Sequence, residues 1–394
     1  YGISIDQLKK ANPQLAPKYK LKKGKTLYIP IVKDSQPKPV VKEENKTVTV
    51  ALILPFSANG IVGERCIEFY RGFLMATEVL VSQGVSINVY AYDEPASNKN
   101  MSLIFDSVRK NHVDLMIAPL YFEHFNEVVN FAKNNRTRTI IPFSSKITDV
   151  HNNEYIYMLN APEEFKNNQI ALSVFELCKN DRIIFMLDNN GNELVLMHHL
   201  RNHLIKNGVD VVDLVSTYSE QDLLNACHST KRNVLLSSGS EKQTFMKRMQ
   251  DIDAIKQKSP NIEVACLGFP EWLNSSQYPK MNLHKINTYV FTNNYYDENN
   301  HLIKSLEKKY MDSFYHNINI SHPNMVLLGH DCATYFIEAL NKGTGESISD
   351  FEIKNKMFQS NLKFSKVSSN GGFVNSGFIL LNYQPNGRLE KINY

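Results

Sequence analysis

The chain has 394 residues, of which 42% are hydrophobic, enough for two or three domains with buried cores. Its formal charge is +4, but eleven lysines and only four acidic residues fall within residues 1–46. The rest of the chain therefore holds 33 basic and 36 acidic residues, a balance that excludes a body binding nucleic acid through its charge. No apolar run approaches the roughly twenty residues of a membrane span.

The first thirty residues predict a short helix followed by a short strand. Ser4 and Gln7 have the spacing of a capping box at a helix start, and Asn12-Pro13 ends that helix. Residues 26–29 form a β-prone run that a proline closes. The predicted order is helix, lysine-rich connection, strand.

The sequence "ANP" followed by "LKKGKTLYIP" resembles the second helix and last strand of a LysM module. The resemblance covers residues 1–31 and implies binding to peptidoglycan or another N-acetylglucosamine glycan, with Asn12 and Pro13 as glycan-binding candidates. The front half of such a module is missing, so we expect a truncated or processed piece. Residues 32–46 have two prolines and no hydrophobic period, which predicts a semi-extended linker. Its lysines suit an anionic wall or membrane surface, or are simply solvated.

From Val48 onward, apolar strands alternate with helices of ten to twenty residues. The first half predicts strands at 48–54, 87–92, 114–118, 139–143 and 155–159, and helices at 63–82, 98–110 and 123–135. The second half predicts strands at 182–187, 209–215, 233–236 and 263–267, and helices at 163–178, 191–207 and 241–257. The end of the chain predicts strands at 288–291, 378–382 and 388–392, and helices at 298–315 and 323–342. This pattern predicts an α/β protein with two doubly wound, mostly parallel sheets.

Two such halves followed by extra segments resemble the type I periplasmic binding protein fold, and within it the branched-chain amino-acid receptors. Local similarities include "VALILPFSANG" at 50–60 and "GHDCATYFIEAL" at 329–340. The resemblance covers residues 47–394. It implies a first lobe made of 47–160 with 290–345 and a second made of 161–289 with 346–394. It also implies a non-enzymatic, solute-binding protein outside the cytoplasmic membrane, periplasmic or attached to the cell envelope and associated with a membrane permease.

Ligands of open parallel sheets gather beyond the carboxyl ends of the strands, so the loops there supply the candidate residues. The ligand-binding candidates are Ser57, Tyr121, Ser144, Ser145, Asn189, Asn190, Ser238, Glu271 and Asp331. Each has a plainer interpretation. The serines and asparagines are equally typical of helix caps and turns, and Asp331 is typical of a structural hydrogen-bond partner.

One departure from the family argues against a free amino acid as the ligand. Relatives that bind amino acids hold the α-carboxylate with a serine-rich loop after the third strand, whereas this loop reads Pro119-Leu120-Tyr121. A carboxylate buried there would lack hydroxyl donors. The leading hypothesis is a wall-tethered protein whose cleft binds another small solute for transport or sensing. The alternative is a scaffold or regulator of peptidoglycan-synthesis enzymes with a degenerate cleft.

Motifs for catalysis, metals and cofactors are missing from the sequence. His199 and His203 have a spacing that can hold a metal, but no third ligand is evident, and we expect a solvated helix face and no metal or cofactor. Residues 237–241, "SSGSE", are not a nucleophile elbow, and no P-loop or dinucleotide fingerprint occurs. No pair of carboxylates supports a glycan hydrolase. Five widely spaced cysteines predict no disulfide framework.

Overall fold

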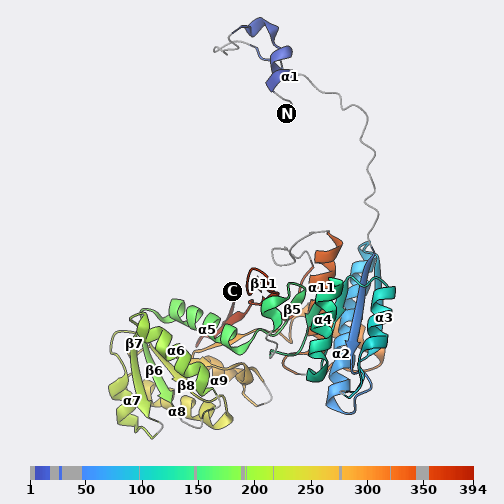
Figure 1. The fold of residues 1–394 in the computed structure, drawn as a ribbon. Helices are drawn as coiled ribbons and strands as arrows, with labels where there is room; N and C mark the ends of the chain where they lie inside the picture. The colour runs from blue at the N-terminus through green and yellow to red at the C-terminus, as the bar shows by residue number, and fades with distance from the viewer. Residues whose placement is uncertain are drawn as a thin grey trace. The chain divides into compact units, whose positions relative to one another are not determined.

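The computed structural model describes residues 5–17, 26–28, 47–96, 98–145, 149–187, 191, 193–215, 217–274, 277–319, 321–342 and 355–394. The chain divides into two units, Tyr1–Lys46 and Thr47–Tyr394 (Figure 1). The first unit contains helix α1 (Ile5–Lys10) and the 3-10 turn η1 (Pro13–Leu15). Ser4 of the predicted capping box and the predicted linker lie outside the described residues.

The second unit is built on two sheets, each with seven strands among the described residues. The first sheet has the order β11-β12-β5-β4-β3-β1-β2, and the second has the order β14-β13-β10-β9-β8-β6-β7. The first contains β1 (Val48–Leu54), β2 (Ile87–Asp93), β3 (Leu115–Ile117), β4 (Arg138–Ile141), β5 (Ile156–Met158), β11 (Phe364–Lys366) and β12 (Phe373–Asn375). The second contains β6 (Arg182–Leu187), β7 (Asp210–Val215), β8 (Asn233–Ser237), β9 (Val264–Gly268), β10 (Thr288–Thr292), β13 (Ile379–Tyr383) and β14 (Leu389–Asn393).

Helices cover both faces of each sheet (Figure 1). The first lobe has α2 (Ile61–Ser82), α3 (Ser102–Lys110), η2 (Phe122–His124), α4 (Phe125–Asn135), η3 (Asp149–Asn152), α10 (His301–Phe314) and α11 (Met325–Asn341). The second lobe has α5 (Glu163–Cys178), α6 (Leu194–Lys206), α7 (Glu220–Ala226), α8 (Lys242–Lys258), η4 (Pro270–Leu273) and α9 (Lys280–Lys285). Pairing is parallel except where β11, β13 and β14 join their neighbours, so the predicted α/β class with two mostly parallel sheets is confirmed.

The chain passes from one lobe to the other at places that differ from the predicted boundaries. All of β10 belongs to the second sheet, whereas the predicted boundary fell at 289/290. β11 and β12 belong to the first sheet, whereas residues 346–394 were assigned to the second lobe. The reason is a pairing in the first sheet: Phe373 lies opposite Tyr157 of β5, with ring centroids 4.7 Å apart and planes within 5°. The chain therefore crosses between the lobes after β5, after β10 and after β12.

Two glycines let helices α2 and α11 touch backbone to backbone. A Cβ added at Gly72 would lie 1.9 Å from the carbonyl oxygen of Val326, and one at Gly329 would lie 1.9 Å from that of Phe69. Every residue of α11 from Met325 to Leu340 is buried. This close packing fixes the N-terminal end of α11, which lines the candidate site.

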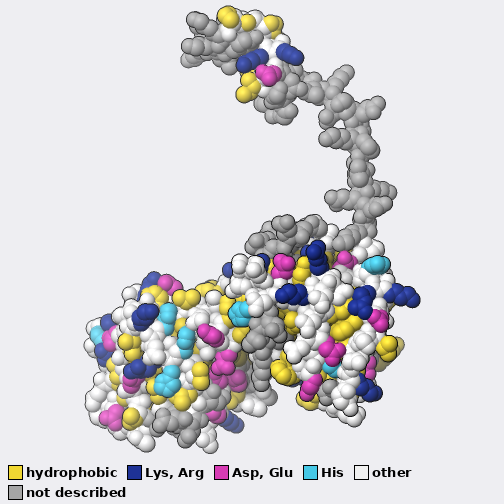
Figure 2. All heavy atoms as spheres, viewed as in Figure 1, with side chains coloured by type: hydrophobic (Ala, Val, Ile, Leu, Met, Phe, Trp, Pro, Cys, Tyr) yellow, Lys and Arg dark blue, Asp and Glu magenta, His cyan; other side chains and the backbone are white. Residues whose placement is uncertain are grey.

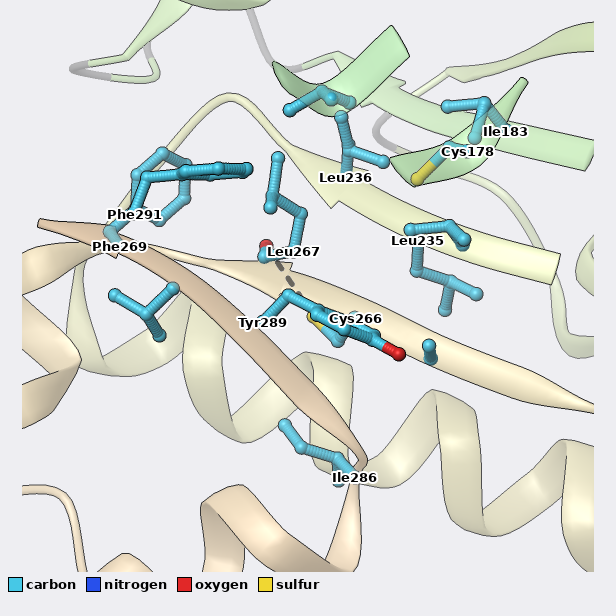
Figure 3. Packing of buried hydrophobic residues seen from close by; sticks show 14 of the residues in the cluster. Cys178, Ile183, Leu235, Leu236, Cys266, Leu267, Phe269, Ile286, Tyr289 and Phe291 are labelled. Atoms are coloured by element: carbon cyan, nitrogen blue, oxygen red, sulfur yellow. Dashed lines mark hydrogen bonds between the residues drawn. The ribbon is translucent and has the colours of Figure 1, made fainter. Parts of the chain in front are cut away.

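The core of the second lobe packs on β8, β9 and β10 (Figure 3). Leu236, Leu267 and Phe291 are almost fully buried in it, as expected for strands of a sheet covered on both faces. Cys266 lies in the same core, and burial raises the pKa of its thiol to about 12. All five cysteines are unpaired, so this thiol behaves as a small hydrophobic group.

The surface of the second unit mixes charges of both signs. On the face shown in Figure 2, lysine and arginine side chains are interspersed with aspartate and glutamate over both lobes. Among the described helices, none combines the length and the apolar character needed to span a bilayer.

Candidate functional site

A cavity of about 290 Å³ lies at the carboxyl ends of the first sheet's strands, beside the chain crossings. The N-terminal turns of α2 and α11 and the loops after β3, β4, β5 and β10 enclose it. Much of its wall is apolar and includes Leu120, Phe143, Leu159, Met325, Leu328 and Leu362. Its polar groups are mainly side-chain amides, supplied by Asn160, Asn293, Asn294 and Asn375, together with Ser360 and Arg65.

A second cavity of about 750 Å³ continues the first toward the other lobe. The two share Asn160, Asn293, Asn294 and Pro323 in their walls. Because the larger cavity also reaches α5 and η4 of the second lobe, the two together form an interlobe cleft. Glu271, predicted as a ligand residue, lines this larger part.

The second-lobe side of the cleft carries both signs of charge. Burial raises the pKa of Glu193, and the nearby carboxylates Glu271, Glu163 and Glu241 raise it further. Burial lowers the pKa of Lys166, which lines the larger cavity, while Glu163 opposes that shift. Of these side chains, Glu271 and Lys166 line the larger cavity, so the second-lobe side presents one carboxylate and one ammonium group to a ligand.

Asp93, at the end of β2, accepts hydrogen bonds from the loop after β1. The backbone N–H of Ser57 donates to Asp93 Oδ1 at 3.0 Å, and the Ser57 hydroxyl donates to Asp93 Oδ2. Ser57 lines neither part of the cleft. The predicted ligand serine instead fastens its loop to the neighbouring strand.

Glu94, the next residue, accepts hydrogen bonds from the loop after β3. Its buried carboxylate accepts the backbone N–H of Leu120 at 2.8 Å and that of Tyr121 at 3.1 Å. Nδ1 of His124 lies 2.9 Å from the same carboxylate, and Nε2 lies 2.9 Å from the carbonyl oxygen of Lys99. Both ring nitrogens of His124 therefore have oxygen partners, and Nδ1 joins the ring to Glu94. Burial raises the pKa of Glu94.

The comparisons with known proteins agree with this geometry at the level of the fold. No protein-family model matches the chain, and no curated protein matches it by sequence. A putative branched-chain amino acid ABC transporter protein from Rhodospirillum rubrum superposes with a TM-score of 0.56 at 8% identity, covering 88% of this chain and 100% of that one. The fold is that of a type I periplasmic binding protein.

Two further solved structures share this architecture. A branched-chain amino acid transporter protein from Rhodopseudomonas palustris has a TM-score of 0.54 at 15% identity, with 88% of this chain and 95% of that chain covered. A substrate-binding protein from Sphaerobacter thermophilus has a TM-score of 0.51 at 12% identity, with coverages of 89% and 97%. At such identities the likeness shows the fold alone, so the site has to be argued from this chain's own residues.

Asp331, predicted as a ligand residue or as a structural hydrogen-bond partner, has a structural place in this fold. Its side chain is fully buried on α11, and its two carboxylate oxygens accept the backbone N–H groups of Phe358, Gln359 and Ser360 at 2.6, 2.9 and 2.8 Å. Three backbone donors leave the carboxylate committed to the 358–360 segment. Ser360 lines the cavity, so its hydrogen bond to Asp331 holds this part of the cavity wall in place.

The remaining candidates lie at different places. Tyr121, Ser144 and Ser145 are half-buried at the loops after β3 and β4 but line neither part of the cleft. Ser238 is buried in a separate cavity of the second lobe. Asn189 and Asn190 lie outside the described residues. Sequence reasoning missed the cleft asparagines, because single amides in connecting segments carry no distinctive pattern.

In the first unit, Asn12 holds two segments together. Its buried side-chain amide donates to the carbonyl oxygens of Leu8 and Tyr28, both at 2.7 Å, and its Oδ1 accepts the backbone N–H of Tyr28 at 2.8 Å. Asn12 is thus a clamp between α1 and residues 26–28, while Pro13 beside it is exposed. These internal bonds give Asn12 a structural role, and the glycan contact at Asn12 and Pro13 stays a prediction.

Replacement of Asn12 by alanine is expected to destabilise the first unit by about 1–3 kcal/mol, because it removes three hydrogen bonds between a buried side chain and the backbone of Leu8 and Tyr28. Amide hydrogen exchange on the full chain should show faster exchange at Tyr28, whose N–H donates to Asn12, and unchanged exchange in the second unit. Lys10→Ala, which removes an exposed side chain at the end of α1, is the control. Unchanged exchange in Asn12→Ala would contradict the clamp.

Proposed function

We propose that residues 47–394 form a non-enzymatic receptor module that binds a small solute between its lobes for transport or sensing. The observation that supports this most is the continuous cleft at the chain crossings, walled by both lobes. Concave, largely apolar cavities with a few converging polar groups are typical of small-molecule sites. The three solved structures compared above are described as ABC transporter proteins, which supports a permease as partner and a location outside the cytoplasmic membrane.

The walls favour a compact solute with an apolar body and hydrogen-bonding groups at one end. Leucine, phenylalanine and methionine side chains surround the inner cavity, and amide groups of Asn160 and Asn293 lie at its mouth toward the second lobe. Arg65 is the one charged residue in the described wall of the inner cavity. The backbone N–H groups of Leu120 and Tyr121, after β3, already donate to Glu94. An α-amino acid whose carboxylate is held by that loop is therefore disfavoured.

Isothermal titration against branched-chain amino acids, aromatic carboxylates, short peptides and muropeptides tests the proposal. We expect one of these classes to bind with a stoichiometry of one. Absence of binding by all four classes of compound would contradict solute binding.

Leu328→Trp is expected to weaken that binding at least about tenfold, equal to about 1.4 kcal/mol, because the larger ring fills the inner cavity. Leu103→Trp is the matched control, since Leu103 is 81% exposed on α3. Equal affinities in the two variants would place the solute elsewhere.

We infer that residues 1–31 tether this module to the cell wall through peptidoglycan. The inference rests on the similarity of this segment to a LysM module and on its lysine excess. Co-sedimentation of the full chain with purified sacculi is expected, and Asn12→Ala should reduce the bound fraction. A chain that stays in the supernatant at low salt would contradict the tether.

The alternative function, a scaffold or regulator of peptidoglycan-synthesis enzymes, has one observation in its favour. Asp93 and Glu94 occupy donors that loops at this edge of the sheet could otherwise offer to a ligand. A pull-down with the full chain from envelope extracts should then recover wall-synthesis enzymes. Recovery of none of them, together with a measured solute affinity, would exclude the alternative.

A further inference from the structure

A separate cavity of about 510 Å³ lies inside the second lobe, at the carboxyl ends of β6 and β8. It shares no lining residue with the two parts of the interlobe cleft. In the second sheet β7 flanks β6 on one side and β8 flanks it on the other, so this is the point at which the strand order reverses. Such switch points are where open α/β sheets bind ligands.

Two loops pack closely at this cavity, and the first turn of helix α8 forms part of its wall. The loops after β6 and β8 touch: a Cβ added at Gly191 would lie 2.2 Å from the carbonyl oxygen of Ser238, and the N–H of Glu193 donates to that oxygen at 2.7 Å. Helix α8 begins at Lys242, and its N-cap Glu241 makes no side-chain capping bond. Thr244 of its first turn lines the cavity. The helix therefore directs its positive end here.

Two residues that line the cavity, Arg248 and Ser237, carry buried donors without partners among the described residues. The Arg248 side chain is only 5% exposed, yet its Nε and Nη1 have no hydrogen-bond partner among the described residues. The Ser237 hydroxyl at the end of β8 is likewise buried and unpartnered there. Unpaired buried donors, above all on a charged group, are costly unless a further group accepts from them.

Neighbouring groups contact one nitrogen of the Arg248 guanidinium and leave the other two without partners among the described residues. Nη2 of Arg248 donates to the Tyr218 hydroxyl at 2.6 Å and lies 3.0 Å from Asp251 Oδ2. The Tyr218 hydroxyl donates to Asp251 at 2.5 Å, and burial raises the pKa of Tyr218, so the phenol stays neutral. Lys247 lines the cavity beside it and lies 3.4 Å from Asp251 Oδ1.

The one carboxylate in the described wall belongs to Glu241, which is exposed and accepts from the Thr244 hydroxyl at 3.4 Å. With Asp251 committed to Arg248, Lys247 and Tyr218, the cavity offers a guanidinium, an ammonium group, hydroxyls and a helix N-terminus to an anion. Its volume exceeds the need of a lone ion and falls within the range of small-molecule sites.

We propose that this cavity binds the phosphate group of a small phosphorylated solute, or free phosphate, with Arg248, Ser237 and the first turn of α8 as its donors. Arg248 supplies charge-assisted bonds from the groups that now lack partners, and Ser237 supplies a hydroxyl from the strand end. The site would act as a second ligand site, independent of the solute in the interlobe cleft.

Isothermal titration of the full chain with inorganic phosphate, glucose 6-phosphate and glucose, at constant ionic strength, tests the proposal. Saturable binding of either phosphate compound and none of glucose is expected. Tighter binding of glucose 6-phosphate would identify a phosphorylated solute, and equal binding would identify free phosphate. Folded protein that binds neither phosphate compound overturns the proposal.

Variants locate the binding. Arg248→Gln is expected to weaken it about 10- to 100-fold and Ser237→Ala about 3- to 10-fold. Lys258→Gln removes one positive charge from the other end of α8, where the side chain is 64% exposed, and should leave the affinity unchanged. Ser237→Ala keeps the test decisive if Arg248→Gln fails to fold, because the lost hydroxyl has no described partner. Wild-type affinity in Ser237→Ala would overturn the assignment.

Discussion

Asp331→Ala is expected to lower the free energy of unfolding by about 3–5 kcal/mol, because three buried backbone N–H groups would lose a charged acceptor at once. Asp331→Asn should cost less but still more than about 1 kcal/mol, since its amide nitrogen cannot accept from the donors that it would face. Urea denaturation of the full chain measures both. Cavity-wall residue Ser360 should become more mobile, and solute affinity should fall with stability.

The matched control is Asp312→Asn on the exposed surface of α10, for which no measurable change is expected. A loss of less than 1 kcal/mol in Asp331→Ala would show that the segment around residues 358–360 is held by its other contacts, and would remove Asp331 from the account of the site.

Glu94→Ala is expected to destabilise the protein by about 3 kcal/mol or more, because the N–H groups of Leu120 and Tyr121 and the ring of His124 would lose their acceptor. The pH dependence is a sharper test. Burial raises the pKa of Glu94 from its ordinary value of 4.5, so between that value and the raised one the folded state binds more protons than the unfolded state.

The part of the Glu94 contribution that depends on its protonation is therefore fully present below pH 4.5 and is lost as the pH rises through its raised pKa. Denaturation curves across this window should show that loss in the wild type, and the slope should be reduced in Glu94→Gln. Glu123→Gln, at an exposed position of η2, should keep the wild-type slope. The same pH dependence in the wild type and in Glu94→Gln would contradict a raised pKa of Glu94.

Much of the architecture was predictable because long periodic segments dominate it. Helix α5 and strands β1 and β6 begin and end at the predicted residues, and the two strands are nearly continuous apolar runs. β11 and β12 were missed because three residues are too few to show a strand period. Their place is set by pairing with β5, a long-range contact that no local pattern reveals.

The site was harder to predict, for a physical reason. Asp93 and Glu94 end a half-exposed strand and look like solvated carboxylates, and only the folded sheet brings amides from two other loops onto them. Asp331 carried a usable signal, because an acidic residue within an apolar helix must find donors. Arg248 sits in a charged stretch of α8, where its burial leaves no trace in the sequence.

Native mass spectrometry of the full chain, purified without denaturation, tests solute binding in the interlobe cleft most directly. The account predicts an adduct of one reproducible mass that is lost on denaturation. That adduct should be depleted in Leu328→Trp and retained in both Leu103→Trp and Ser237→Ala. A wild-type protein that carries no adduct and gains none from envelope extract, or an adduct that Leu328→Trp leaves untouched, would contradict it.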